Sequence, residues 1–208
     1  MQYKDLEREL RKLGFDFSQS QLQGLMLYIS TLLKWNRSIN LVGYNNWLDI
    51  LHYLVVDSFY LGRFLEKIVS QTDTCSLDLG AGAGLPGVPL RLVWNPGDYY
   101  LVESRVKRAA FLRQILHLMG LEKTYVLNKR AEDLPQDILP ADLILSRAFM
   151  PWNRLLPLAG SLLAPGGKLV ILGSEDIETR DLSGFNPLDR MDYLAGGKNR
   201  CFWALEKL

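Results

Sequence analysis

The chain has few of the residues on which several classes of protein depend. Its 208 residues include two cysteines, Cys75 and Cys201, and two histidines, His52 and His117. The cysteines have no metal-binding spacing, so we expect no metal site and two buried free thiols on strands. Neither histidine has an acidic partner at a recognisable spacing. We therefore expect both histidines to be structural rather than catalytic.

Long apolar runs and an excess of one charge are also missing. The first 20 residues are charged and lack the apolar segment of a secretory signal, and no uncharged run is long enough to span a bilayer. These absences predict a cytoplasmic protein without a membrane segment. The net charge is only +1, from 24 basic and 23 acidic residues. Such a balance argues against a protein that coats nucleic acid nonspecifically through a large net positive charge.

What the chain does contain is a glycine-rich turn after a short apolar segment. Residues 75–79 predict a buried strand, and residues 80–87 read GAGAGLPG. Glycine permits positive φ and lets a ligand approach the backbone closely. A helix expected over residues 88–93 would complete the nucleotide cradle of an α/β sheet. Asp78 either caps the amides of this turn or organises the loop around a charged ligand.

A second apolar run, residues 99–102, ends at Glu103. In a βαβ unit that binds a nucleotide, an acidic residue follows the glycine turn at about this distance in sequence and lies beside the ribose. We therefore expect Glu103 to accept hydrogen bonds from the ribose hydroxyls. The turn reads D-x-G-x-G-x-G, whereas the dinucleotide fingerprint reads G-x-G-x-x-G. The difference favours S-adenosylmethionine over NAD as the ligand.

The organisation of the chain follows from its apolar periodicity. The first ~70 residues predict helices, one of them opened by a capping box at residues 18–21. From residue 74 onward strands and helices alternate, which indicates a mostly parallel sheet. The predicted strands are 75–79, 99–102, 124–127, 142–145, 168–172 and 201–205. Residues 173–199 predict loops around a weak strand. We expect a helical extension over residues 1–73 and an α/β domain over residues 74–208.

Several short motifs occur together in one known family. They are Lys34-Trp35-Asn36, Asp57-Ser58, the turn 80–87, Glu103-Ser104 with Lys107-Arg108, Arg130-Ala131-Glu132 and Ser146-Arg147-Ala148-Phe149. With this combination, which spans nearly its whole length, the chain resembles the RsmG (GidB) family. Members of that family methylate N7 of a guanine in 16S ribosomal RNA. The chain departs from the family pattern at Leu54, where a histidine is usual, and at Gly173, where a lysine is common.

The resemblance implies a fold, a cofactor and a partner. The fold would be a class I (Rossmann-like) S-adenosylmethionine-dependent methyltransferase sheet with an N-terminal helical extension. The partner would be 16S ribosomal RNA or the small ribosomal subunit, bound by a monomer. The expected cofactor-binding residues are Asp78, Gly80, Gly82, Leu85, Glu103, Ala131, Glu132 and Arg147. The expected substrate-binding residues are Trp35, Asn36, Arg105, Lys107, Arg108, Arg113 and Phe149.

Basic residues are concentrated directly after the second predicted strand. The segment 104–130 contains one acid, Glu122, and the following basic residues: Arg105, Lys107, Arg108, Arg113, Lys123, Lys129 and Arg130. A solvated helix face would explain this excess. We prefer a footprint for RNA phosphates, because phosphate contacts supply most of the nonspecific affinity for nucleic acid.

The expected chemistry needs alignment rather than a general base. Guanine N7 carries a lone pair and no proton, so it can attack a sulfonium methyl directly. Arg147 is expected to position the reactants by pairing with the cofactor carboxylate, RNA phosphate or guanine O6. Phe149 either stacks on the guanine or packs in the core, and Trp35 is a core anchor or a base-stacking platform.

Two other functions also fit the sequence. A methyltransferase of the same fold could act on a small molecule or a protein, although the basic segment argues against that. A noncatalytic RNA-binding or ribosome-assembly protein could retain the fold, although the intact glycine turn with Glu103 argues against it.

Overall fold

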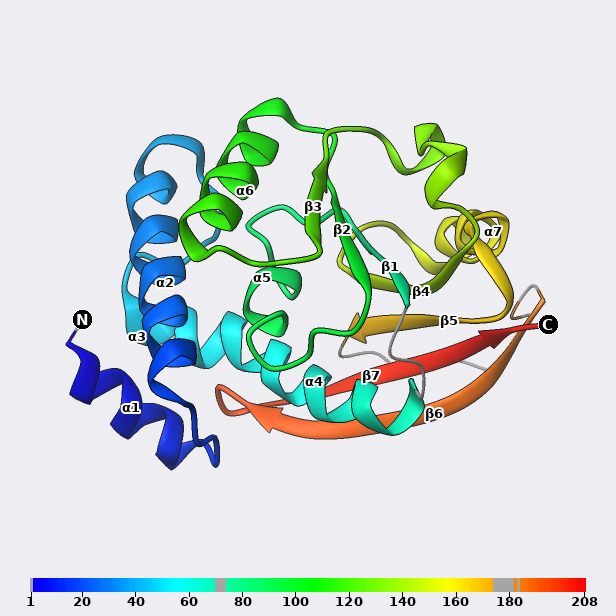
Figure 1. Cartoon of the computed structure of the whole chain (residues 1–208). Helices are drawn as coiled ribbons and strands as arrows, with labels where there is room; N and C mark the ends of the chain where they lie inside the picture. Colours follow the sequence, from blue (N-terminus) through cyan, green and yellow to red (C-terminus); the bar gives the residue numbers. More distant parts are fainter. Residues whose placement is uncertain (1, 70–73, 174–181, 183) are drawn as a thin grey trace.

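A computed structural model of the chain describes residues 2–69, 74–173, 182 and 184–208. It is built on a seven-stranded sheet with the order β3-β2-β1-β4-β5-β7-β6 (Figure 1). The strands are β1 (Cys75–Leu79), β2 (Asp98–Val102), β3 (Thr124–Leu127), β4 (Ala141–Arg147), β5 (Leu163–Gly173), β6 (Phe185–Ala195) and β7 (Lys198–Lys207). The first five are parallel, while β7 is antiparallel to both β5 and β6. The carboxyl ends of β1 to β5 therefore meet at one edge of the sheet, where ligands of such sheets bind.

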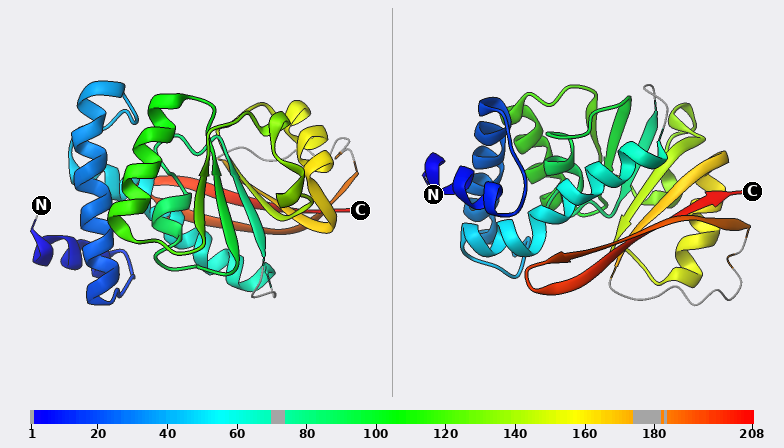
Figure 2. Two further views of the ribbon diagram at one scale, coloured as in Figure 1. Left: turned by 45° about the horizontal axis from the view of Figure 1, so that its top comes forward. Right: turned by 90° about the horizontal axis from the view of Figure 1, so that it is seen from below.

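Helices cover both faces of this sheet (Figure 2). They are α1 (Tyr3–Lys12), α2 (Gln19–Ile39), α3 (Trp47–Ile50), a π-helical turn (Leu51–Val55), α4 (Val56–Ile68), α5 (Gly87–Leu90), α6 (Val106–Met119) and α7 (Trp152–Leu162). Leu143 and Leu145 of β4 belong to the core under α4 to α6, whereas Ile144 belongs to the core under α7. This alternation is what a strand buried on both faces requires.

The N-terminal helices share the first of these cores. Leu25 and Ile29 of α2 are fully buried, and Phe64 of α4 packs on Phe202 of β7 with their ring centroids 5.8 Å apart. The predicted capping box is confirmed, because the Gln21 amide donates to Ser18 Oγ and the Gln21 side chain accepts from the Ser18 amide. Among the residues that the structure describes, none of the helices has the length and apolar character needed to cross a bilayer.

The strand expected within residues 173–199 is present, but it is longer than a weak strand between loops implies. Strand β6 runs through Phe185–Ala195 and pairs with β7 along its length, although residues 174–181 and 183 lie outside the described part. It is an edge strand with mostly exposed side chains, so it lacks the apolar alternation by which a buried strand is recognised. The helix expected over residues 88–93 is also shorter, since α5 ends at Leu90.

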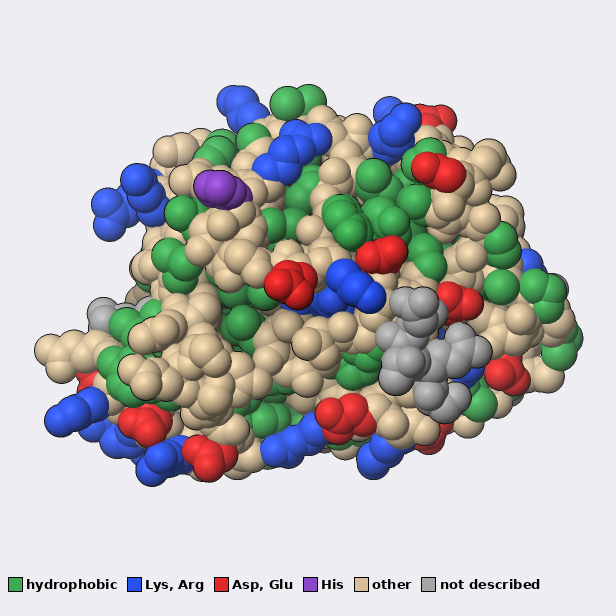
Figure 3. Space-filling model, viewed as in Figure 1, with side chains coloured by type: hydrophobic (Ala, Val, Ile, Leu, Met, Phe, Trp, Pro, Cys, Tyr) green, Lys and Arg blue, Asp and Glu red, His purple; other side chains and the backbone are tan. Residues whose placement is uncertain are grey.

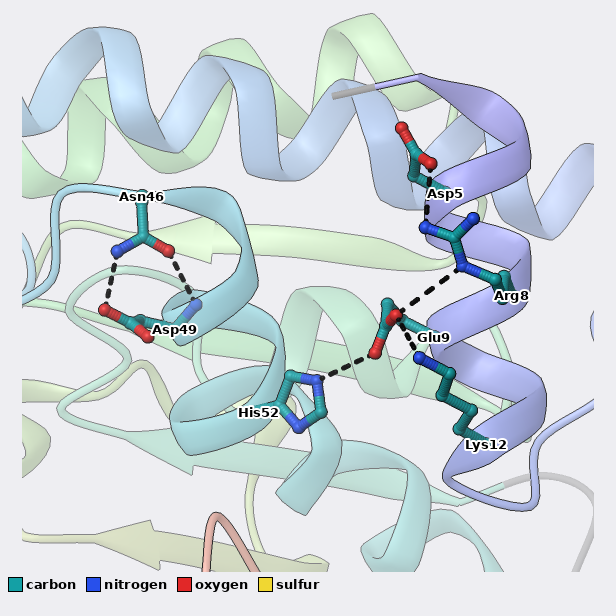
Figure 4. A network of polar contacts seen from close by, with 7 residues as sticks. All are labelled: Asp5, Arg8, Glu9, Lys12, Asn46, Asp49 and His52. Atoms are coloured by element: carbon teal, nitrogen blue, oxygen red, sulfur yellow. Dashed lines mark hydrogen bonds and ion pairs between the residues drawn. The ribbon is translucent and has the colours of Figure 1, made fainter.

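His52 has a partner that sequence spacing did not reveal. Its Nε2 lies 3.5 Å from Oε2 of Glu9 on α1 (Figure 4). Glu9 lies far from His52 in the sequence, so it is not a partner at a recognisable spacing, and the contact joins α1 to the π-helical turn. Neither Cys75 nor Cys201 is in a disulfide bond; Cys201 is buried, whereas Cys75 is only partly buried.

Candidate functional site

The glycine turn lies at the carboxyl end of β1 and is tied to β2. The amides of Gly80 and Ala81 both donate to the carbonyl of Val102, at 2.9 and 3.0 Å. Gly80 has a φ of +73°, and a Cβ there would lie 2.5 Å from Cδ2 of Phe149. Only glycine fits this combination of backbone conformation and close packing.

Asp78 faces inward beneath this turn. Its Oδ2 accepts hydrogen bonds from the Gly87 amide at 3.1 Å and from the Tyr99 hydroxyl at 3.3 Å. The side chain is fully buried, and burial raises its pKa to about 7. A Cβ at Gly87 would lie 2.5 Å from Asp78 Oδ2. The geometry thus gives Asp78 the role of capping and shaping the turn, which is the first of its two expected roles.

Glu103 joins the turn to the chain that follows β2. Its Oε2 accepts from the Gly82 amide at 3.0 Å, and its Oε1 accepts from the Arg105 amide at 2.7 Å. A buried carboxylate held by two amides has its oxygens fixed before any ligand arrives. Such an acceptor can bind ribose hydroxyls with little loss of side-chain freedom.

A cavity of about 450 Å³ opens along this edge of the sheet. Its lining consists of Gly80, Val102, Glu103, Ser104, Arg105, Arg108, Lys129, Arg130, Ala131, Glu132, Ala148, Phe149, Met150 and Arg154. The structure therefore brings Gly80, Glu103, Ala131 and Glu132 together, as the sequence predicted. This volume lies in the range of small-molecule sites.

The rim of the cavity is cationic. Exposed side chains there include those of Arg105, Lys129, Arg130 and Arg154. The two other predicted basic residues, Lys107 and Arg113, are exposed on α6 but do not line the cavity. On the face shown in Figure 3, lysine and arginine side chains are interspersed with acidic ones rather than forming one block. This distribution of charge favours binding of a polyanion at one site over nonspecific binding across the whole surface.

Arg147 does not line this cavity. Its Nη2 lies 3.0 Å from Oδ2 of Asp57 on α4, and its Nη1 donates to the carbonyl of Leu54 at 3.2 Å. The next residue, Ala148, has a φ of +49°, and Phe149 then packs against the glycine turn. A non-glycine residue with positive φ is strained, and such residues are common at functional sites. Here it separates an arginine on the α4 side from an aromatic ring in the cavity wall.

Asn36 and Trp35, both predicted to bind substrate, form hydrogen bonds within the fold. Asn36 is 5% exposed, and its side-chain amide donates to the carbonyls of Val42 and Tyr44 while its oxygen accepts from the Val42 amide. This arrangement argues against a substrate contact, because every bond would have to be broken first. Trp35 donates to Gln114 Oε1 at 2.8 Å and so joins α2 to α6, which fits the core anchor that was one of its two expected roles.

Sequence reasoning missed some residues of the site. Lys129 and Arg130 belong to the basic segment in which the sequence predicts an RNA footprint, and the structure adds that they line the cavity. Arg154 had no sequence signal, because it reaches the rim from α7. Asp57 was visible only as part of a motif, since its contacts with Arg147 and Arg200 span 90 residues or more.

Residues 21–182 match the family GidB, described as rRNA small subunit methyltransferase G. The chain belongs to this family. It is 42% identical over 205 residues to the Ribosomal RNA small subunit methyltransferase G of Nitratidesulfovibrio vulgaris, covering 99% of this chain and 94% of the relative. The protein of that name from Lawsonia intracellularis is 41% identical over 198 residues, covering 94% and 91%.

Solved structures support the fold. MtNAS in complex with MTA and tNA has a TM-score of 0.63 at 13% identity, covering 99% of this chain and 75% of that chain. Magnesium protoporphyrin IX methyltransferase from Synechocystis PCC 6803, with bound SAM, has a TM-score of 0.63 at 11% identity, covering 87% and 97%. The predicted class I methyltransferase fold is confirmed. Together with the family, it makes the protein a methyltransferase whose methyl donor is S-adenosylmethionine.

Proposed function

We propose that this protein transfers a methyl group from S-adenosylmethionine to N7 of a guanine in 16S ribosomal RNA. The observation that carries the proposal is the cavity in which the glycine turn and Glu103 meet a cationic rim. The names of the relatives supply the nucleic acid and the subunit. The acceptor is either free RNA or RNA within the small ribosomal subunit.

The residues of the cavity fit the cofactor. Gly80 lets the Phe149 ring of the cavity wall pack directly against the turn, and Glu103 presents its carboxylate for the ribose. We propose that backbone at Gly82 and Leu85 completes the cradle and that Asp78 keeps it in shape. Ala131 and Glu132, which also line the cavity, would hold the adenine ring and accept from its amino group. The bound cofactor supplies an electrophilic methyl group on a sulfonium.

The reaction then requires placement of the acceptor. The N7 lone pair forms the new bond to the methyl carbon as the bond from that carbon to sulfur breaks, and no proton is lost from N7. Protein groups therefore contribute by holding the two reactants in line. We propose that Phe149, in the cavity wall, stacks on the guanine and that Arg147 binds an anionic group of either reactant.

Basic side chains around the cavity would hold the RNA backbone. The proposed footprint consists of Arg105, Lys107, Arg108 and Arg113, extended by the rim residues Lys129, Arg130 and Arg154. Each phosphate contact should release counterions and make binding depend on salt. Asn36 and Trp35 are left out of this footprint, because the fold already uses their polar groups.

We further propose that the protein acts as a monomer in the cytoplasm, with residues 1–73 as an extension of the methyltransferase domain at 74–208. The compartment follows from the ribosomal substrate, since ribosomal RNA is modified where ribosomes are assembled. The extension is supported by the position of its helices, which complete the core on one face of the sheet.

A transfer assay tests the proposed function. Purified protein is incubated with methyl-labelled S-adenosylmethionine and, separately, with small-subunit RNA, intact small subunits and large-subunit RNA. Label should enter small-subunit RNA or subunits only, and nucleoside digestion should recover it as 7-methylguanosine. Cofactor binding without any transfer to RNA would instead favour a methyltransferase of another acceptor. RNA binding without cofactor binding would favour an assembly protein.

A further inference from the structure

A buried carboxylate on α4 is the meeting point of three side chains from distant parts of the chain. Asp57 is 3% exposed, and Arg147, Arg200 and Tyr193 all contact it. Arg147 Nη2 lies 3.0 Å from its Oδ2, and the Tyr193 hydroxyl donates to its Oδ1 at 3.0 Å. Arg200 Nη1 donates to the same Oδ2 that Arg147 contacts. One carboxylate therefore connects β4 to both strands of the C-terminal hairpin.

The π-helical turn before α4 fixes the other side of both arginines. Arg147 Nη1 donates to the carbonyl of Leu54 at 3.2 Å, and Arg200 Nη2 donates to the carbonyl of Tyr53 at 2.9 Å. Turns of this kind are irregular in their backbone hydrogen bonding and are frequent at functional sites. Each guanidinium is thus held between a carbonyl and Asp57, which determines the direction in which it points.

These contacts leave part of Arg147 available. A guanidinium has five N–H groups, and the contacts to Asp57 and Leu54 involve only its two terminal nitrogens. Its side chain is 21% exposed, whereas that of Asp57 is 4% exposed. The cluster formed by Asp57, Arg147 and Arg200 also carries two positive charges against one negative charge. It therefore has an excess cation for an anionic ligand, presented by the arginine that immediately precedes Ala148 and Phe149.

We propose that Asp57 is a positioning residue for methyl transfer. It orients Arg147 toward an anionic group of a reactant, and through Arg200 and Tyr193 it makes the C-terminal hairpin part of the site. The proposal rests on the role given to Arg147 above. The anion is a carboxylate or a phosphate, and these come from different reactants: the carboxylate belongs to the cofactor and the phosphate to RNA.

A double-mutant cycle tests this inference. Dissociation constants for S-adenosylmethionine and for small-subunit RNA are measured separately for the wild type, Asp57→Asn, Arg147→Ala and the double variant, with single-turnover rates for each. We expect each single substitution to weaken one of the two affinities by about tenfold, which identifies the anion. The double variant should be no worse than Arg147→Ala alone, because Asp57 acts through that arginine.

Two further variants separate positioning from simple loss of stability. Tyr193→Phe keeps every charge and removes one hydrogen bond to Asp57, so it should fold and weaken the same affinity by about twofold to fivefold. Arg91→Lys is the matched control, because Arg91 is a buried arginine that donates to the carbonyls of Pro96 and Gly97 at the opposite end of the strands. It should lower the melting temperature and leave both affinities unchanged.

Several results would overturn the inference. Losses that add in the double variant would mean that Asp57 acts independently of Arg147. Unchanged affinities and rate in Asp57→Asn or in Tyr193→Phe, or losses in Arg91→Lys as large as theirs, would reduce the cluster to a structural one. If Arg147→Ala alone changed nothing, Asp57 would have no residue to position. Because cofactor and RNA affinities are measured without turnover, these outcomes are distinct from a failure of the enzyme to methylate small-subunit RNA.

Discussion

Glu103 at the end of β2 accepts a hydrogen bond from the amide of Gly82, in the turn that follows β1, at 3.0 Å. Two neighbouring strands are thus linked across the place where the cofactor is proposed to bind. The same carboxylate accepts from the Arg105 amide at 2.7 Å, so it also fixes the start of the basic segment. The proposed ribose contact and the entry to α6 therefore share one side chain.

Substitution of Glu103 should weaken cofactor binding. Glu103→Ala removes a charge-assisted acceptor for the ribose, which should cost about 2 kcal/mol, or roughly thirtyfold in the dissociation constant. Glu103→Gln retains one oxygen and should lose less. Titration calorimetry with S-adenosylmethionine measures both, and thermal denaturation shows whether the turn has kept its stability. An unchanged dissociation constant for Glu103→Ala would rule out the ribose contact.

The rim of the cavity should determine how strongly RNA binding depends on salt. Removing one phosphate contact should reduce the magnitude of the slope of log K against log salt by roughly one. We expect this reduction for Arg108→Ala and for Arg154→Ala, which lie on different elements around the cavity. Arg11→Ala is the control, because Arg11 is an exposed arginine of α1 that pairs with Glu7. Equal slopes in all four proteins would remove the two rim arginines from the footprint.

Asp78 should make the stability of the protein depend on pH in an unusual direction. Burial raises its pKa from 3.8 to about 7, so between these values the folded chain holds a proton that the unfolded chain has lost. Its contribution to stability therefore falls as pH rises from about 4 to about 7. Asp78→Asn keeps an acceptor for Gly87 and Tyr99 and carries no charge.

The melting temperature of Asp78→Asn relative to that of the wild type should therefore rise between pH 5 and pH 8, by several degrees Celsius. Taking the difference cancels the other titrating groups, which the two proteins share. A difference that stays constant across this range would show that the buried carboxyl does not titrate there.

The transfer step should not need either histidine. Because N7 loses no proton, the single-turnover rate at saturating substrates should be nearly flat from about pH 6 to 9. His52→Asn and His117→Asn should keep the rate within about twofold, whereas Arg147→Ala should lose much more. Any pH dependence that comes from the glycine turn should disappear in Asp78→Asn. A bell-shaped profile abolished by a histidine substitution would indicate an acceptor atom that carries a proton.

Local sequence was sufficient to predict one half of the site. The turn 80–87, Glu103 and the pair Ala131 and Glu132 each follow a short apolar run, and parallel strands bring such positions together without further information. Their convergence on one cavity follows from the alternation of strands and helices alone.

The other half depends on contacts between distant segments. Nothing near Arg147 in the sequence indicates Asp57. The sequence predicts only a weak strand where β6 lies, since an edge strand with exposed side chains has no buried face to impose an apolar pattern. Asn36 was assigned to substrate because its motif is typical of the family, whereas its bonds to Val42 and Tyr44 depend on a turn that spacing does not predict.

The central claim is that this protein places a methyl group on N7 of a guanine in small-subunit RNA. Its most direct test maps 7-methylguanosine along 16S ribosomal RNA from cells that lack the protein, from the same cells supplied with the wild type, and from cells supplied with Glu103→Ala. We predict that one site loses the modification when the protein is absent, regains it with the wild type, and regains little of it with the variant. An unchanged map in cells lacking the protein would contradict the account.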